Sequence, residues 1–179
     1  MFPGKDIYGF HLQSETAGVT ICCILRLKYV YWKNNTRNIV YLQINNIIMA
    51  KQEYIEKNRA WLADKAKEPR VIALDKGVLY KVIRSGKGGP TPNRNSVVTA
   101  HYVGKTINGK TFDSSRGGVA PAFRLRDLIP GWIIALQQMH VGDKWEIYIP
   151  AELAYGRFNQ PGIPGGSTLI FEIELLGIA

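Results

Sequence analysis

Nine aromatic side chains occur around Asp113 in the second half of the chain, and no plausible nucleophile or metal-ligand set accompanies them. The nine are Tyr102, Phe112, Phe123, Trp132, Trp145, Tyr148, Tyr155, Phe158 and Phe171. Ser114, Ser115 and Ser167 lack both a Gly-x-Ser-x-Gly setting and a histidine placed as base, so we do not expect a hydrolase. Residues of these types predict a site that binds an apolar, flat group and performs little covalent chemistry.

Two alternating stretches predict strands on either side of a loop. Val78–Arg84 alternates apolar with basic residues, and Val97–Gly104 alternates with Tyr102 on its apolar face. Residues 85–95 between them are rich in glycine and proline, which predicts a loop. The Gly-Lys-Gly-Gly segment of this loop lacks the spacing of a phosphate-binding motif and precedes no helical pattern, so we expect no nucleotide site there.

The next strand is expected to return through a tight turn. Asn108-Gly109 is the favoured two-residue hairpin turn, in which both positions need a positive φ. A hairpin at this point brings Phe112 and Asp113 back beside the strand that carries Tyr102. The turn therefore places the carboxylate next to the first aromatic residues.

One short helix is predicted in this half of the chain, over Pro130–Met139. Pro130 suits a first helical position, and Trp132 lies on the apolar face of the helical pattern. Two more alternating stretches, residues 145–149 and 169–175, predict further strands. Many antiparallel strands with one helix imply an α+β domain, in which a curled antiparallel β-sheet wraps around the helix. The other face of the sheet is expected to be in solvent.

Five motifs then occur in order between residues 97 and 178. They are His101-Tyr102-Val103-Gly104, Phe112-Asp113-Ser114-Ser115, Ile129-Pro130-Gly131-Trp132, Ala154-Tyr155-Gly156 and the segment Thr168–Leu176. With these motifs the chain resembles the FKBP-type peptidyl-prolyl cis-trans isomerases, the family that binds the macrolide immunosuppressants. Residues 76–88 further resemble the strand that leads into bacterial members with an N-terminal helical extension. The resemblance implies an FKBP-like fold preceded by a short helix.

The resemblance also implies a role for each residue of the site. Trp132 would form the floor on which a proline ring rests, and the walls would be formed by Tyr102, Phe112, Phe123, Leu128, Ile129, Ile163 and Phe171. The Ile129 backbone N–H and the Tyr155 hydroxyl would each donate to a carbonyl of the bound peptide or macrolide. The Asp113 carboxylate would lie near the rotating carbonyl carbon and help to hold the twisted geometry. Taken singly, Trp132 would be a core residue and Asp113 a turn residue that caps Ser114 or Ser115.

The implied activity is acceleration of X–Pro isomerisation during protein folding, with proline-containing polypeptides and macrolide inhibitors as partners and with no cofactor or metal. Rotation about this amide faces a barrier on the order of 20 kcal/mol, because twisting destroys the amide resonance. An apolar pocket favours the twisted amide, which has lost charge separation, over the planar and more polar amide. Such differential binding needs no nucleophile.

Two other functions remain open at this point. One is a proline-peptide binding module or holdase that keeps the fold with weak turnover. The other is nucleic-acid binding through the net charge of +9. The 23 basic residues are scattered, with no run of four or more, so a solvated basic surface is favoured over a nucleic-acid groove.

Two loops depart from the pattern of the family. The connection from Ala120 to Leu128 is shorter than in single-domain eukaryotic members, which leaves the register of Phe123 open by one pocket position. Gly165-Gly166 stands where bulkier or proline residues are usual, which predicts a more mobile loop.

The 179 residues suffice for one globular domain and an extension. We predict an isomerase domain over residues 76–179, a helical extension and linker over 49–75, and a disordered or mis-assigned extension over 1–48. The last prediction rests on composition, because Tyr29–Ile48 contains five Asn, four Ile and three Tyr, as translated AT-rich DNA does. Met49 would then be the real start, and any native peptide from before Met49 would contradict this.

Residues 50–68 carry a helical pattern that ends at Pro69. A helix of this length is marginal alone and must pack on a partner domain, a dimer mate or its own core. Because it is short, a monomer is expected. No apolar stretch reaches the roughly 18 residues of a membrane span, and the missing signal favours a cytoplasmic location.

Overall fold

The computed structural model describes the backbone of residues 35–179, with side chains from residue 41 onward. The predictions made for residues 1–34 lie outside this range. The chain divides into two units, Met1–Ile48 and Met49–Ala179, and the sheet and the site described below belong to the second unit. Among the described helices, none combines the length and the apolar character needed to cross a bilayer.

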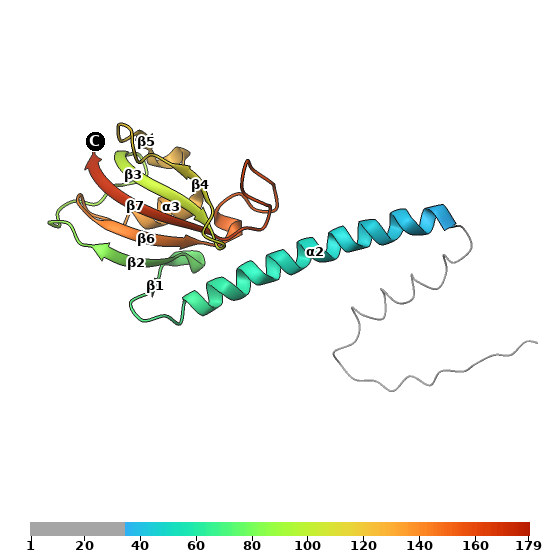
Figure 1. Cartoon of the computed structure of the whole chain (residues 1–179). Coiled ribbons are helices and arrows are strands. Elements are labelled where there is room, and N and C mark those ends of the chain that lie inside the picture. Colours follow the sequence, from blue (N-terminus) through green and yellow to red (C-terminus); the bar gives the residue numbers. More distant parts are fainter. Residues whose placement is uncertain (1–34) are drawn as a thin grey trace, which may run out of the picture. The chain divides into compact units, whose positions relative to one another are not determined.

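An antiparallel sheet forms the body of the second unit (Figure 1). In the described part of the chain its strands are β1 (Ile72–Ala73), β2 (Leu79–Arg84), β3 (Val97–Thr106), β4 (Thr111–Ser114), β5 (Ala122–Arg124), β6 (Lys144–Ile149) and β7 (Leu169–Ile178). The order across the sheet is β1-β2-β6-β7-β3-β4, and β5 also pairs with β3. Single 3-10 turns, η1 (Asp75–Gly77), η2 (Leu125–Asp127) and η3 (Ala151–Leu153), lie between strands. The predicted α+β class and its antiparallel sheet are confirmed.

Helix α3 (Pro130–Leu136) packs on the apolar face of this sheet. Its close approach depends on Gly131, because a Cβ at that position would lie 2.3 Å from Cγ2 of Ile149 on β6. The helix is shorter than predicted. After Leu136 the chain continues in tighter turns, in which the Met139 N–H donates to the Leu136 carbonyl at 3.1 Å. Met139 is nevertheless fully buried, which explains why the apolar pattern runs past the end of the helix.

The β3–β4 hairpin forms as predicted, but its turn has a different geometry. Gly109 has a φ of +79°, whereas Asn108 is not among the residues with positive φ. The Thr106 N–H donates to the Lys110 carbonyl at 3.0 Å, and the register shifts between Gly104 and Lys105. The loop is therefore longer than two residues and carries one left-handed glycine. The pairing still places Asp113 opposite Gly104, so the carboxylate returns beside β3 as predicted.

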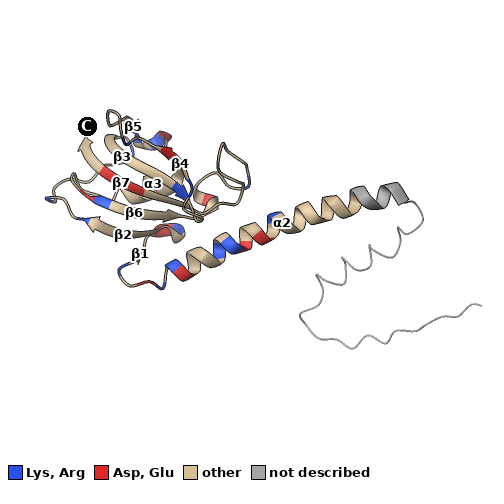
Figure 2. Ribbon diagram, in the orientation of Figure 1, with Lys and Arg blue, Asp and Glu red and all other residues tan. Residues whose placement is uncertain are grey.

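The helix before the sheet begins earlier than the sequence pattern indicates. Helix α2 spans Asn35–Lys65, rather than residues 50–68. A periodic pattern reveals a helix through its buried face, and residues nearer the start of α2 bury little: Leu42, Ile47 and Met49 are 50%, 69% and 57% exposed. Figure 2 shows the same contrast in charge, because Lys, Arg, Asp and Glu occur on the C-terminal part of α2 and not on residues 41–50.

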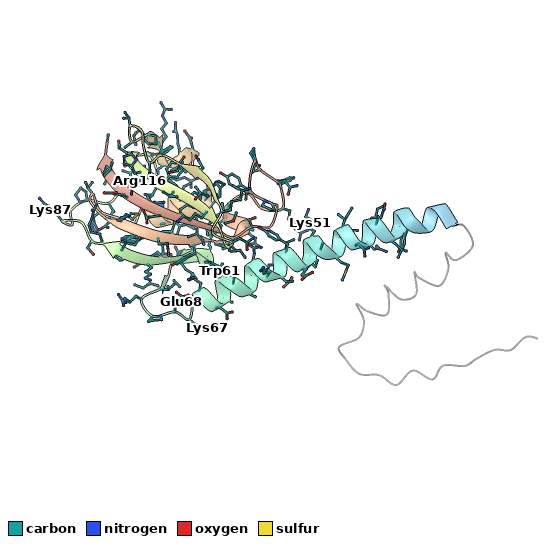
Figure 3. All side chains as sticks on the ribbon, in the orientation of Figure 1. Lys51, Trp61, Lys67, Glu68, Lys87 and Arg116 are labelled. Carbon is teal, nitrogen blue, oxygen red and sulfur yellow. The ribbon has the colours of Figure 1, made fainter. Side chains whose placement is uncertain are left out.

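The C-terminal part of α2 packs on its own domain, which was one of the three partners considered for it. Trp61 meets Tyr148 of β6 edge to face, with ring centroids 5.8 Å apart, and Lys65 lies over both rings. Figure 3 labels Trp61 on this part of the helix. Tyr148 is only 1% exposed although it alternates with the inward residues of β6. The expectation that the outer face of the sheet is solvated is therefore wrong at this place.

Elsewhere the outer face of the sheet carries ion pairs that link different strands, and one of their basic residues lies in the loop after β4. Glu174 of β7 accepts hydrogen bonds from Arg84 at 2.6 Å and from Arg116 at 2.9 Å. Arg116 and Lys144 also pair with Glu172. Figure 2 shows both acidic and basic positions on the strands of the sheet. Arg84, Arg116 and Lys144 are therefore paired with carboxylates of the sheet.

We expect Glu174→Gln to destabilise the fold in a pH-dependent way. The hydrogen bond from Arg84, and then that from Arg116, holds the pKa of Glu174 below its usual value of 4.5, although burial opposes this. A group whose pKa is lower in the folded than in the unfolded state stabilises the fold at pH values above its unfolded pKa. This stabilisation is lost as the pH falls through the folded pKa. The free energy of unfolding of the variant should therefore be about 1 kcal/mol lower than that of the parent at pH 7. The two values should become equal in acid.

Urea unfolding of both proteins across acid and neutral pH measures this difference. Glu53→Gln on α2 is the control, because no ion pair of Glu53 occurs among the described residues. A loss of stability by Glu174→Gln that is the same at all pH values would contradict the assignment.

Candidate functional site

Trp132 is the centre of a group of aromatic rings. Its side chain is 4% exposed, and the rings of Tyr102, Phe123 and Phe171 stand edge to face around it. Their centroids lie 5.3, 5.9 and 5.2 Å from that of Trp132, with interplanar angles of 82°, 77° and 88°. Edge-to-face packing holds each ring at a fixed angle to its neighbour. A buried indole plane bordered by three upright rings has the form of a floor with walls.

Five elements bring the predicted pocket residues together. Tyr102 comes from β3, Phe112 from β4, Phe123 from β5, Trp132 from α3 and Phe171 from β7. One hydrophobic cluster contains the floor and every predicted wall residue, namely Tyr102, Phe112, Phe123, Leu128, Ile129, Trp132, Ile163 and Phe171. The register of Phe123, which the sequence left open, is fixed by its pairing with Val98.

Gly104 lets two of the walls meet, and no role was predicted for it. A Cβ at this position would lie 2.6 Å from Cζ of Phe112 and 2.8 Å from Cε1 of Phe171. The two rings pack against each other edge to face, with centroids 5.6 Å apart. Their packing occupies the space that any larger residue would need. The glycine ends one of the sequence motifs, but only the structure gives the reason for it.

The Asp113 carboxylate accepts one hydrogen bond from Tyr102 and one from Ser114, and its role toward a ligand stays a prediction. Its Oδ2 accepts a hydrogen bond from the Tyr102 hydroxyl at 2.6 Å. Its Oδ1 accepts the Ser114 N–H at 2.8 Å, which is the capping contact expected of a turn residue. Asp113 is exposed, so one side of the carboxylate remains open to a ligand.

The bond to Asp113 affects the acid–base behaviour of Tyr102. Burial first, and then the hydrogen bond and negative charge of Asp113, raise the pKa of Tyr102 from 10.0 to about 12. The phenol is therefore a neutral donor over the whole physiological range. A group whose pKa is higher in the folded than in the unfolded state stabilises the fold fully at pH values below its unfolded pKa. The contribution of Tyr102 to stability is therefore complete below pH 10 and is lost as the pH rises toward 12.

The segment that enters α3 presents a backbone donor at the edge of the rings. Ile129 is extended, with φ −59° and ψ 146°, and its carbonyl accepts the N–H groups of Trp132 and Ile133. Its own N–H is not used in any hydrogen bond among the described residues. Pro130 has no N–H, so Ile129 supplies the donor at this point of the chain. The geometry suits the predicted contact with a ligand carbonyl.

The loop between η3 and β7 supplies the remaining two residues. Ile163 is 5% exposed and belongs to the cluster around Trp132. Tyr155 is 37% exposed, and its hydroxyl has no hydrogen bond among the described residues. Tyr155 lies close enough to Tyr102 to contribute to raising the pKa of that residue. The catalytic and binding roles of these residues, like those of Asp113 and Ile129, stay predictions.

Three of the nine aromatic residues lie outside the site. Trp145 stacks on Tyr80, with centroids 4.1 Å apart, and Tyr148 lies on the opposite face under Trp61. Phe158 is 77% exposed. Residue type alone could not separate these from the pocket residues, because the separation depends on the neighbours that the fold gives each side chain.

The arrangement supports binding by shape and hydrogen bonds rather than covalent chemistry. It offers an indole floor, apolar walls, a free backbone donor at Ile129 and the open carboxylate of Asp113. The indole Nε1 of Trp132 is buried without a hydrogen-bond partner in the described part of the protein. A site with these features suits a small, nearly apolar ring that is flanked by carbonyl groups.

Comparisons with known proteins agree with this fold. The profile of the family described as FKBP-type peptidyl-prolyl cis-trans isomerase matches residues 88–176. The FKBP-type 22 kDa peptidyl-prolyl cis-trans isomerase of Escherichia coli is 48% identical over 120 residues, which are 66% of this chain and 58% of that protein.

Two solved structures are also similar. A peptidyl-prolyl cis-trans isomerase of Pseudomonas syringae superposes with a TM-score of 0.67 at 36% identity, over 72% of this chain and 95% of the other. FkpA of Escherichia coli gives 0.68 at 31% identity, over 93% and 83%. The chain therefore belongs to the FKBP-type peptidyl-prolyl cis-trans isomerase family. It spans about half the length of the curated relatives it matches.

We expect Asp113→Ala to lower both the pKa of Tyr102 and the isomerase activity. Without the carboxylate, burial and the smaller electrostatic effect of Tyr155 remain, so the pKa of Tyr102 should fall from about 12 toward its ordinary value. The loss of one hydrogen bond to a charged group should reduce kcat/KM by about tenfold. The difference in phenolate absorbance between variant and parent during an alkaline titration isolates Tyr102. Full activity in Asp113→Ala would remove Asp113 from the site.

Proposed function

We propose that this protein accelerates the cis–trans isomerisation of X–Pro bonds in polypeptide chains. One observation carries the proposal: the buried indole of Trp132 is walled by three upright rings, in a chain that belongs to the FKBP-type family. The floor has the size and polarity to receive a proline ring. The donors and the acceptor around it would then face the carbonyl groups on either side of that ring.

Catalysis would arise from stronger binding of the twisted amide than of the planar one. The planar amide is the more polar form, and the apolar walls disfavour it relative to the twisted form, which has lost its resonance. The Ile129 N–H and the Tyr155 hydroxyl would fix the flanking carbonyls, and Asp113 would hold the rotating carbonyl. Each 1.36 kcal/mol of such preference is about tenfold in rate. No side chain needs to take a proton or to form a bond with the substrate.

A protease-coupled assay with a proline peptide, together with a proline-limited refolding assay, tests the proposal. We expect both to be accelerated in proportion to the protein concentration, and a macrolide of the kind bound by this family to inhibit both. Turnover at background level with retained macrolide binding would instead establish a proline-binding module or holdase. The macrolide is therefore included in both assays.

We also propose that the protein is a monomer. Two observations bear on this. The full length of α2 removes one reason for the prediction, because the helix is not confined to residues 50–68. The packing of Trp61 on Tyr148 supports it, since the C-terminal part of the helix is engaged within its own chain. Sedimentation velocity of the full chain decides between monomer and dimer. The cytoplasmic location and a role as a folding helper stay predictions, which cell fractionation and a refolding assay check.

A further inference from the structure

Helix α2 makes a series of specific contacts with one short segment of the domain, residues 164–168. Asn58 of α2 is 1% exposed, and its Oδ1 accepts the Thr168 N–H at 2.8 Å. Its backbone carbonyl accepts the Thr168 hydroxyl at 3.3 Å. The Asn58 Nδ2 donates back to the Tyr54 carbonyl at 2.8 Å, which fixes the orientation of the amide. Asn58 therefore joins the helix to the residue that immediately precedes β7.

Tyr54, one turn earlier on the helix, begins a second connection. Its hydroxyl lies 2.8 Å from the Ser167 Oγ, and that Oγ donates to the Pro164 carbonyl at 2.5 Å. A serine hydroxyl has one hydrogen, so the Tyr54 hydroxyl must be the donor to Ser167. Ser167 is 4% exposed. The chain of bonds thus runs from α2 to Pro164, the residue next to Ile163.

Gly165 and Gly166, which lie between these contacts, pack so closely on their neighbours that there is no space for a side chain. A Cβ on Gly166 would lie 2.4 Å from Cγ1 of Ile55, and Gly166 has a φ of +86°. A Cβ on Gly165 would lie 2.2 Å from the Arg157 carbonyl oxygen. The sequence suggested that these glycines loosen the loop. In the structure they allow the loop to approach both itself and α2 closely, and the mobility of the loop stays a prediction.

This segment is continuous with three residues of the site. Ile163 precedes it directly, and Phe171 follows it by three residues on β7. The Gly166 N–H donates to the Gly156 carbonyl at 2.8 Å, and Gly156 adjoins Tyr155. The contacts from α2 therefore act at the root of the loop that carries Ile163 and Tyr155.

We propose that Tyr54 and Asn58 of helix α2 are positioning residues for the isomerase site, because they hold the segment 164–168 that places Ile163 and Tyr155. This inference rests on the proposed function, since it concerns the same pocket. It means that the helix before the sheet affects substrate binding through residues 164–168. Residues 76–179, which the sequence marks as the isomerase domain, would not hold this wall in place by themselves.

Four variants of the full chain and one control variant test the proposal. Tyr54→Phe removes only the hydroxyl that donates to Ser167, and Asn58→Ala removes the amide that accepts the Thr168 N–H. Arg59→Ala is the matched control, because Arg59 lies on the same helix and its pair with Glu152 is exposed on both sides. Ser167→Ala, alone and with Tyr54→Phe, shows whether the two hydroxyl groups act together.

We expect KM for a proline peptide to rise about twofold to tenfold in Tyr54→Phe and Asn58→Ala, with kcat nearly unchanged. A loosened wall weakens the planar and the twisted amide alike, so the effect should fall on KM. Arg59→Ala should match the parent, and the double variant should be no worse than Tyr54→Phe alone. Far-ultraviolet circular dichroism and a thermal melt establish that each variant is folded.

A purely structural role predicts a different result. In that case the melting temperature of Asn58→Ala would fall while KM and kcat both stayed at parental values, and this outcome would overturn the proposal. If the parent shows no turnover, the proposed function fails, and affinity for the same peptide is then measured by titration. Weaker binding by Tyr54→Phe than by Arg59→Ala would still support the positioning role, and equal binding would refute it.

Discussion

Trp132→Ala is expected to abolish most of the activity and to lower the free energy of unfolding by about 3–5 kcal/mol. Trp132 is 4% exposed and is the neighbour that Tyr102, Phe123 and Phe171 share. Its removal leaves a cavity beneath three rings and takes away the surface on which the proline ring would rest. We expect kcat/KM to fall by about a hundredfold or more, equivalent to ~2.7 kcal/mol. Urea unfolding and the protease-coupled assay measure the two effects.

Two further variants separate the loss of the site from the loss of the fold. Trp145→Ala removes another indole, which is 6% exposed and stacks on Tyr80 outside the pocket. It should be destabilised to a similar extent but keep most of its activity at temperatures where it is folded. Trp132→Phe keeps an aromatic floor and removes a buried N–H that has no partner within the described residues, so its losses should be smaller. Equal activity in Trp132→Ala and Trp145→Ala would place the site elsewhere.

Gly104→Ala is expected to distort the pocket by the addition of a single methyl group. The new Cβ would lie 2.6–2.8 Å from ring atoms of Phe112 and Phe171. Phe171 is 4% exposed and packs on Trp132, so it has little room to move. Overpacking of this kind typically costs about 1–3 kcal/mol. Because the displaced rings are walls of the site, we expect kcat/KM to fall by about tenfold, equivalent to ~1.4 kcal/mol.

Gly118→Ala provides the control for this prediction. A Cβ at Gly118 meets no atom within 4 Å, and its φ is not positive. This variant should be neutral or slightly more stable, because alanine restricts the unfolded chain. Parental activity in Gly104→Ala would show that the walls can shift without consequence for the substrate.

The strands and α3 could be predicted because each has a buried face that repeats along the sequence. Alternation marked β3, β6 and β7, and the apolar stripe marked the helix that carries Trp132. The start of α2 could not be predicted in the same way. Leu42 and Ile47 are half exposed or more, so the residues there follow no buried stripe. The outer face of β6 was misjudged for a related reason, since nothing in β6 itself reveals that Trp61 covers Tyr148.

The sequence by itself determined the family, because its motifs lie in order along the chain, and the resemblance only predicted the residues of the pocket. The tertiary structure decided which aromatic residues share one pocket, since Trp132 and Trp145 differ in their neighbours and not in their type. It also decided why two glycines are needed. Gly104 and Gly166 each lie where another side chain occupies the space of a Cβ, and such distances arise only when distant segments pack together. The contact of α2 with residues 164–168 is of the same kind, because its partners are separated by about a hundred residues of sequence.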